Sequence, residues 1–250
     1  MTFLEMFSLA AAGVIAGWFN VVAGGGSMLT VPIMLFMGMP APVANGTNRI
    51  GILMQDVVAV TAFRKKGFSD FRLSLSLAAM ASIGAVGGAL LGVRLEGELF
   101  RWFLAVVMVV TMIMMTVQKK KSRATEHADG KPKRVVLGHI LMIVAGFWGG
   151  LIQIGVGFIL MPILHKVMDL DLVRVNMHKV FIVLVYTFVA LLVFMTNVSI
   201  NWYAGIALAC GTMIGGWLGA HYSVSYGDIW IRRVLFVTMS LFIIKLLFFS

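Results

Sequence analysis

The sequence predicts an all-α integral membrane protein made of two related, inverted repeats, each with a glycine-broken helix pair followed by three transmembrane helices. Three observations carry this prediction: long apolar blocks, an internal repeat, and a glycine-rich break near the start of each repeat. Of the 250 residues, 60% are hydrophobic and only 12% are charged, whereas soluble domains carry about 25% charged residues. The bilayer is therefore the expected solvent.

The apolar blocks mostly approach the length of about 20 residues that a spanning helix needs. Residues 1–20 precede them with Glu5 as the only charged side chain, and without the features of a secretory signal, so we expect this stretch in the mature protein. The single Cys210 excludes an intrachain disulfide or a cysteine metal cluster. The blocks are Ala41–Phe63, Phe71–Val93, Phe100–Val117, Val135–Gln153, Leu172–Thr196, Trp202–Tyr222 and Ile229–Phe249.

The formal net charge of +10 is concentrated in the linker from Gln118 to Arg134. Basic loops between apolar blocks hold their side of the protein in the cytoplasm, so this linker indicates membrane topology and not a nucleic-acid partner. The expected organisation is a first transmembrane repeat over residues 1–117, a basic cytoplasmic linker over 118–134, and a second transmembrane repeat over 135–250.

A shift of 130 residues superposes the two halves of the chain. It places Pro32 on Pro162 and Arg49 on Lys179, as expected for the structural repeats of a transporter. Further along, a shift of 127 aligns two glycine ladders with i, i+4, i+8 spacing, which predict close packing of membrane helices. The ladders are Gly84, Gly88 and Gly92 in the first half and Gly211, Gly215 and Gly219 in the second.

Each repeat opens with an apolar stretch that is broken by glycines, over 23–27 and over 153–157. The piece Met28–Met37 would be about 15 Å long as a helix, too short to cross the hydrocarbon, so we expect a half-helix, with a counterpart that begins near Gly157 to Pro162. If each broken unit returns to its own side, 16 of the 20 Lys and Arg residues lie on the cytoplasmic side, against 12 if it crosses once. This count favours inverted repeats.

The segment Asn20–Pro32 (NVVAGGGSMLTVP), followed by Ala44–Asn48, resembles the TauE/SafE sulfite exporter family. A basic hairpin at Phe63–Gly67 and the run from Gly146 to Pro162 continue the resemblance over essentially the whole chain. The resemblance implies transport of sulfite, of organosulfonates such as sulfoacetate, or of related sulfur-containing anions across a prokaryotic inner membrane.

A glycine-broken helix persists in hydrocarbon only where protein or a water-filled cavity satisfies its exposed backbone groups. The start of a half-helix offers free N–H groups and a positive dipole end, which suit a small anion; the alternative is that the glycines only permit tight packing. The candidate anion-binding residues are Asn20, Gly24, Gly25, Gly26, Ser27, Thr30, Asn45, Thr47, Asn48, Arg49, Gln153, Gly155, Gly157, Asn176, His178 and Lys179.

Arg49, Asp56 and Lys179 are charged residues that lie several residues inside apolar blocks. Arg49 and Lys179 occupy equivalent positions and are expected either to attract the anion or to snorkel to an interface. The polar residues beside them have helix capping as the alternative role. Asp56 follows Arg49 by seven residues, close to the same helical face, and is expected either to pair with one of the two cations or to carry a coupling proton. Its repeat equivalent is Tyr186.

The leading functional hypothesis is a secondary transporter that moves a small anion by alternating access, with proton coupling left open. An anion channel and a non-transporting membrane subunit are the alternatives. We expect no catalytic residues, metal or cofactor, because the chain lacks paired acidic or His residues, metal-ligand spacing and nucleotide-binding motifs. The expected partners are a small anionic substrate and the lipid bilayer but no nucleic acid, and a homodimer is left open.

Overall fold

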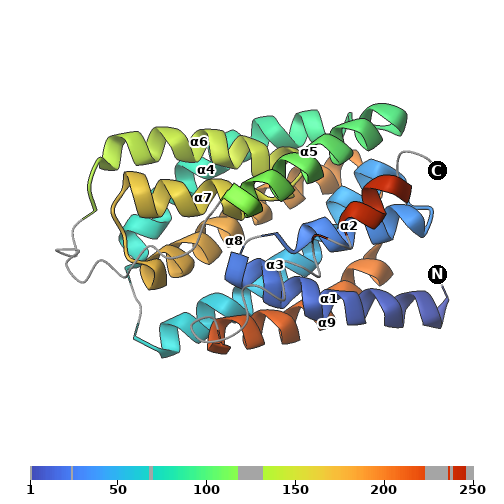
Figure 1. Ribbon diagram of the computed structural model, residues 1–250, viewed down its shortest axis with the longest axis horizontal. Coiled ribbons are helices and arrows are strands. Elements are labelled where there is room, and N and C mark those ends of the chain that lie inside the picture. Colours follow the sequence, from blue (N-terminus) through green and yellow to red (C-terminus); the bar gives the residue numbers. More distant parts are fainter. Residues whose placement is uncertain are drawn as a thin grey trace.

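The computed structural model describes residues 2–23, 25–67, 70–117, 132–222, 236 and 239–245. Within these ranges the protein is helical and contains no strand, which confirms the predicted fold class. The elements are α1 (Phe3–Ala23), α2 (Ser27–Phe36), α3 (Ala41–Lys65), α4 (Phe71–Gly92), α5 (Gly97–Val117), α6 (Val135–Leu151), α7 (Val156–Pro162), the π-helix η1 (Ile163–Val167), α8 (Leu172–Asn197) and α9 (Trp202–Tyr222), arranged along one long axis (Figure 1). Most of the linker and of the last apolar block lies outside the described residues.

Both predicted breaks are present. In the first repeat α1 ends at Ala23 and the half-helix α2 begins at Ser27. In the second, α6 ends at Leu151 and α7 begins at Val156, one residue before the predicted range. The second break is held open by backbone in the left-handed region, with φ +64° at Gln153 and +70° at Gly155. That region costs glycine little, but it costs a side chain such as that of Gln153 about 1–3 kcal/mol.

Helices of the two repeats interlock. The helix that opens each repeat packs mainly on the fourth helix of the other repeat, so that α1 lies against α9 and α6 lies against α4. Between these two pairs, α3 packs on α9, α8 packs on α4, and α3 and α8 also contact each other (Figure 1). The two longest helices, one from each repeat, therefore form the centre of the molecule.

The glycine ladders lie where helices approach most closely, as predicted. A Cβ built on Gly84 would lie 1.9 Å from the Ile143 carbonyl oxygen, and one on Gly88 would lie 1.9 Å from that of Phe147. The residue numbers of the contacting pairs increase along both helices, so α4 and α6 run parallel, and their backbones are in direct contact.

Replacing Gly88 with alanine is expected to lower the melting temperature of the detergent-solubilised protein. The new methyl group would overlap the α6 backbone, which cannot move aside without separating the helices, and overpacking of this kind costs about 1–3 kcal/mol. Gly87→Ala is the matched control, because a Cβ there would meet only the Phe147 ring, at 3.7 Å. Equal melting temperatures for the two variants would contradict this account of the interface.

The same contacts show which end of the molecule each helix starts from. The contacts of Gly13 and Gly215 show that α1 runs parallel to α9. Those of Gly51 and Gly216 show that α3 also runs parallel to α9. Because α1 and α3 run in the same direction, the α1–α2 unit is a hairpin that returns to the end where α1 starts. This is the geometry that inverted repeats require. The inverted orientation across a membrane stays a prediction, which these contacts support.

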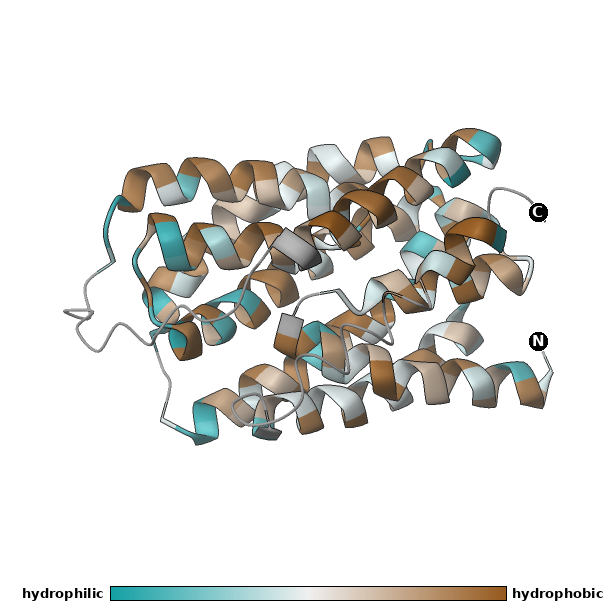
Figure 2. Ribbon diagram, viewed as in Figure 1, coloured by the Kyte–Doolittle hydropathy of each residue, from teal (hydrophilic) through white to brown (hydrophobic). Residues whose placement is uncertain are grey.

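Five helices in the described part of the chain are long and apolar enough to cross a membrane: Phe3–Val22, Phe71–Gly92, Gly97–Met114, Leu172–Asn197 and Trp202–His221. Most of the ribbon is hydrophobic or near neutral in hydropathy, and most of the hydrophilic residues lie towards the ends of the long axis (Figure 2). The 25-residue α3 is absent from this set. Its interior carries the polar residues of the candidate site, which lower its hydropathy.

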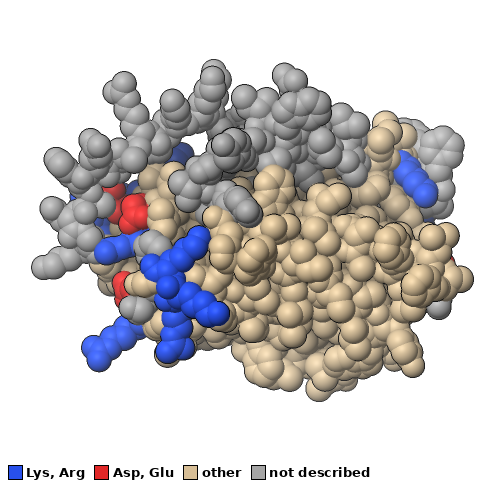
Figure 3. All heavy atoms as spheres, turned by 90° about the horizontal axis from the view of Figure 1, so that it is seen from below, with Lys and Arg blue, Asp and Glu red and all other residues tan. Residues whose placement is uncertain are grey.

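Basic side chains gather at one end of the long axis (Figure 3). At this end Lys66 donates to the Ala220 carbonyl over 2.8 Å, and an exposed Lys133 lies 2.7 Å from Asp169. The hydrogen bond and the charge of Lys133 lower the pKa of the Asp169 carboxyl. A basic end of this kind is typical of the cytoplasmic side of a membrane protein.

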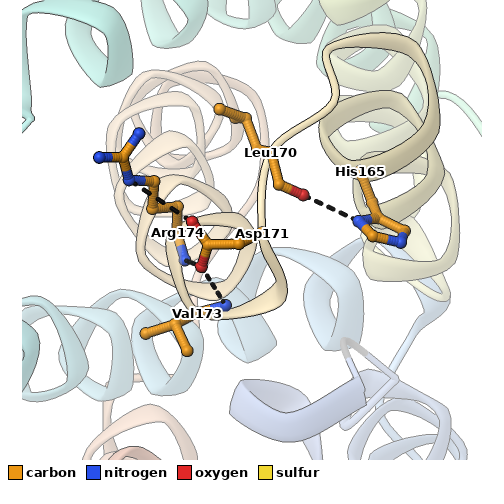
Figure 4. A network of polar contacts seen from close by, with 5 residues as sticks. All are labelled: His165, Leu170, Asp171, Val173 and Arg174. Atoms are coloured by element: carbon orange, nitrogen blue, oxygen red, sulfur yellow. Dashed lines mark hydrogen bonds and ion pairs between the residues drawn. The ribbon is translucent and has the colours of Figure 1, made fainter. Parts of the chain in front are cut away.

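The α8 helix starts at this basic end with a side-chain cap. Asp171 accepts from the backbone N–H groups of Val173 and Arg174, both at 3.0 Å, and Arg174 Nε lies 3.5 Å from its carboxylate (Figure 4). His165 Nδ1 lies 2.8 Å from the Leu170 carbonyl just before the cap. The N-cap position of α8 is therefore filled by Asp171 and by none of the polar residues that were candidates for capping.

Candidate functional site

The two breaks meet in the middle of the molecule. A Cβ on Gly25 would lie 3.1 Å from the Phe158 ring of α7, and one on Gly155 would lie 3.2 Å from the Met28 side chain of α2. Each break is thus lined by the half-helix of the other repeat. The first and second halves of the chain therefore contribute one break each to a single region.

Arg49 of α3 reaches the second break. It is fully buried, and its guanidinium donates to the Gly149 carbonyl over 3.1 Å, to the Gly150 carbonyl, and to Gln153 Oε1 over 3.2 Å. It also lies 4.4 Å from the centre of the Phe194 ring, a favourable cation–π distance. The snorkelling alternative is wrong for Arg49, because the side chain reaches no surface.

Lys179 of α8 makes the equivalent contacts at the first break. Its ammonium donates to the Val21 carbonyl over 2.6 Å and to the Asn20 carbonyl over 3.4 Å, and also to Asn176 Oδ1 over 3.1 Å. The residue is only 2% exposed, so it does not snorkel either. The cation of each repeat therefore binds the broken helix of the other repeat.

These cations bind the carboxyl ends of α1 and α6, where the last carbonyls of a helix have no partner within the helix. Cations there also stabilise the negative end of the helix dipole. Asn45 completes the set at the second break by donating to the Leu151 carbonyl over 2.8 Å. Capping thus does occur, but Asn45, Arg49 and Lys179 cap the helices of the opposite repeat and not their own.

Asp56 lies near the first break in a chain of amides. Its Oδ1 accepts from Gln55 Nε2 over 2.9 Å, and Gln55 Oε1 accepts from Asn20 Nδ2 over 3.4 Å. The second carboxylate oxygen is buried without a hydrogen-bond partner among the described residues. Lys179 is an electrostatic neighbour of Asp56, but no ion pair within 4.0 Å joins Asp56 to Lys179 or Arg49. Asp56 is therefore coupled to Lys179 through their charges and not through a direct salt bridge.

A third polar group lies at the start of α2. Thr30 Oγ1 donates to Asn48 Oδ1 over 2.5 Å, and Asn48 Nδ2 donates to Ser27 Oγ over 3.1 Å. The Gly26 N–H, also at this helix start, donates to Asn20 Oδ1 over 3.4 Å. All of these side chains but Asn20 are buried, so α3 joins α2 to the first break through polar contacts.

Some sequence candidates lie elsewhere. Thr47 Oγ1 accepts from the Asn201 N–H in the α8–α9 loop over 3.1 Å, so it faces away from the breaks. His178 Nδ1 lies 2.7 Å from Ser74 Oγ on α4, and its Nε2 is buried without a described partner. Gly157 is buried within α7, and Gly24 lies outside the described residues.

The sequence does not identify two side chains in this region, those of Thr187 and Tyr186. Gln153 Nε2 donates to Thr187 Oγ1 of α8 over 3.0 Å, and the fully buried Tyr186 precedes Thr187 on the same helix. Both lie in an apolar run and show no polar pattern, so the repeat relation to Asp56 was the one signal that pointed to Tyr186. In the described part of the chain, no group of three or more His, Cys, Asp or Glu residues has the geometry of a metal site.

Charge distinguishes this centre from an ordinary helix core. Two cations and one carboxylate are buried on α3 and α8, although burial of a charge is costly unless it is paired. With all three ionised, the region carries one net positive charge. Such an arrangement attracts one negative charge, or an anion of higher charge together with a proton.

Comparison with known proteins identifies similar sequences along nearly the whole chain. The family model described as sulfite exporter TauE/SafE matches residues 9–246. A "probable membrane transporter protein ORF9" from Sinorhizobium is 26% identical over 96% of this chain and 91% of its own length. A "probable membrane transporter protein" of Haemophilus influenzae is 21% identical over 96% of this chain and 93% of its own length. The "probable membrane transporter protein YfcA" of Escherichia coli K12 is 23% identical over 94% of this chain and 87% of its own length. No solved structure matches the chain significantly.

Proposed function

Because the chain belongs to the sulfite exporter TauE/SafE family of membrane transporters, we propose that it is a secondary carrier of a small sulfur oxyanion. The substrate class is sulfite or an organosulfonate, carried across a prokaryotic inner membrane. The observation that carries this proposal is the pair of buried cations, Arg49 and Lys179, at two broken helices that meet in the protein interior. The net positive charge of this centre favours an anion over a neutral or cationic substrate.

The interlocked repeats support alternating access over a continuous channel. Each cation belongs to one repeat and caps the helix of the other, so a movement of one repeat against the other changes the contacts at both breaks together. Rocking of repeats around a central site is the usual mechanism of carriers with this architecture. A channel needs no such cross-repeat contacts, and a non-transporting subunit needs no buried cations at glycine breaks.

Asp56 is the proposed proton-coupling group. It is the one acidic side chain buried in the described membrane helices, and protonation would remove its charge beside Lys179. Binding of a proton at Asp56 would raise the positive charge of the centre and so favour binding of the anion. Proton and anion would then move in the same direction.

Purified protein in liposomes is expected to take up sulfite, and an inward proton gradient is expected to raise the accumulated amount. Uptake is measured with sulfite, sulfoacetate, thiosulfate and sulfate, each with and without the gradient and against protein-free liposomes. The expected order places sulfite or sulfoacetate first. The proposed function is wrong if no sulfur oxyanion enters above the protein-free background.

A further inference from the structure

The two central helices differ at one pair of equivalent positions. Asp56 of α3 and Tyr186 of α8 are related by the repeat shift of 130 residues. Both are buried, at 1% and 0% exposure, and both have an oxygen without a hydrogen-bond partner among the described residues. One is a carboxylate, which repels anions when ionised, and the other is a phenol, which donates a hydrogen bond to them.

Tyr186 shares its surroundings with Arg49. A Cβ built on Gly149 would lie 2.7 Å from the Tyr186 hydroxyl oxygen, and the Gly149 carbonyl accepts from Arg49. Tyr186 and Arg49 are electrostatic neighbours. Arg49 Nε is also buried without a described partner. The side chains of Gln153 and Thr187 lie close to the Tyr186 hydroxyl, but neither forms a hydrogen bond of normal geometry with it. Two donors without such a bond, one of them on a cation, therefore lie near the same glycine at the second break.

In the other half of the centre, at the first break, the buried charges balance each other. The groups that face Asp56 from α8 are Lys179 and Tyr186. From α1 it is approached by the amide of Asn20 through Gln55, and α9 presents Gly216 to Gln55. The half-helix α2 contributes no ionisable side chain. The charges of Lys179 and an ionised Asp56 therefore cancel, whereas no carboxylate among the described residues lies beside Arg49.

We propose that the two pseudo-symmetric halves of the centre have separate tasks: Tyr186 and Arg49 Nε bind an oxygen of the transported anion, and Asp56 with Lys179 holds the proton. This inference rests on the proposed transport function and assigns Tyr186 as a substrate-binding residue. An oxyanion with several acceptor oxygens accepts from both donors at once. A site built to hydrogen-bond its substrate binds such a ligand much more tightly than one that leaves a donor unpaired. The same pair of donors disfavours a neutral substrate.

The test measures sulfite uptake in liposomes by the wild-type protein and by the Tyr186→Phe and Asp56→Asn variants. Uptake is measured at an acidic and at an alkaline pH, and each variant is compared with the wild type at the same pH. Tyr186→Phe keeps the ring and removes the hydroxyl, so we expect the half-saturating sulfite concentration to rise about tenfold, with the stimulation by a proton gradient retained. Asp56→Asn is expected to lose that stimulation and to keep the wild-type half-saturating concentration at acidic pH.

Tyr203→Phe is the matched control, because Tyr203 is 77% exposed on α9, and it is expected to behave as wild type. An unchanged half-saturating concentration in Tyr186→Phe, with folding verified by size-exclusion chromatography, overturns the assignment while the transport function stands. If Tyr186→Phe does not fold, the Asp56→Asn variant alone tests the assignment. An altered half-saturating concentration of this variant at acidic pH places the anion in the Asp56 half and overturns the assignment. Absence of uptake by the wild type contradicts the transport function itself.

Discussion

Replacing Arg49 with alanine is expected to abolish saturable anion uptake and to lower the melting temperature of the protein. The variant removes the charge that the centre offers to an anion, and it leaves the carbonyls of Gly149 and Gly150 buried without their donor. Each unsatisfied buried group costs about 1–3 kcal/mol, so two of them amount to a large share of the stability of a protein. Uptake is measured in liposomes and melting in detergent.

Arg49→Lys separates the two roles of the guanidinium. Lysine keeps the charge, but its single ammonium cannot match the planar fork that binds two carbonyls and Gln153 together. We therefore expect Arg49→Lys to recover part of the stability and little of the uptake, because the Nε donor is lost. Wild-type uptake by Arg49→Ala would place the anion elsewhere in the protein.

Most of the fold followed from patterns that act along the chain. The apolar blocks predict helices over Leu172–Thr196 and Trp202–Tyr222, and the structure has them at Leu172–Asn197 and Trp202–Tyr222. Hydrophobicity decides such boundaries, since a helix in a bilayer ends where its apolar run ends. Glycine runs likewise marked both breaks, because they are poor helix formers wherever they occur.

The contacts of the site did not follow from the sequence, because they depend on how distant helices pack. The repeat shift paired Arg49 with Lys179, but only the packing of α3 and α8 shows that each cation reaches a break of the other repeat. Tyr186 was hidden for a different reason. Aromatic residues are common in apolar helices, and a hydroxyl without a partner becomes visible only when its surroundings are known.

Replacing Lys179 with methionine is expected to destabilise the protein at alkaline pH, because it leaves an ionised, buried Asp56 without the cation to which it is electrostatically coupled. Loss of one partner of a direct buried salt bridge costs about 3–5 kcal/mol, which is the upper limit for this pair. Methionine has a similar length and fills the space, so the loss arises from charge and from the freed carbonyls of Asn20 and Val21. With Lys179 gone, an ionised Asp56 has no cation beside it. Melting temperature in detergent measures the effect.

Adding Asp56→Asn to Lys179→Met is expected to restore more than half of the lost stability, because the double variant buries neither charge. The same Asp56→Asn change added to Arg49→Met should restore none, since the described part of the Arg49 half contains no carboxylate to remove. Strictly additive effects of Asp56→Asn and Lys179→Met would show that these two groups do not interact. Rescue of Lys179→Met but not of Arg49→Met would instead leave Arg49 as the one unbalanced charge in the described centre, and a substrate anion is the group suited to balance it.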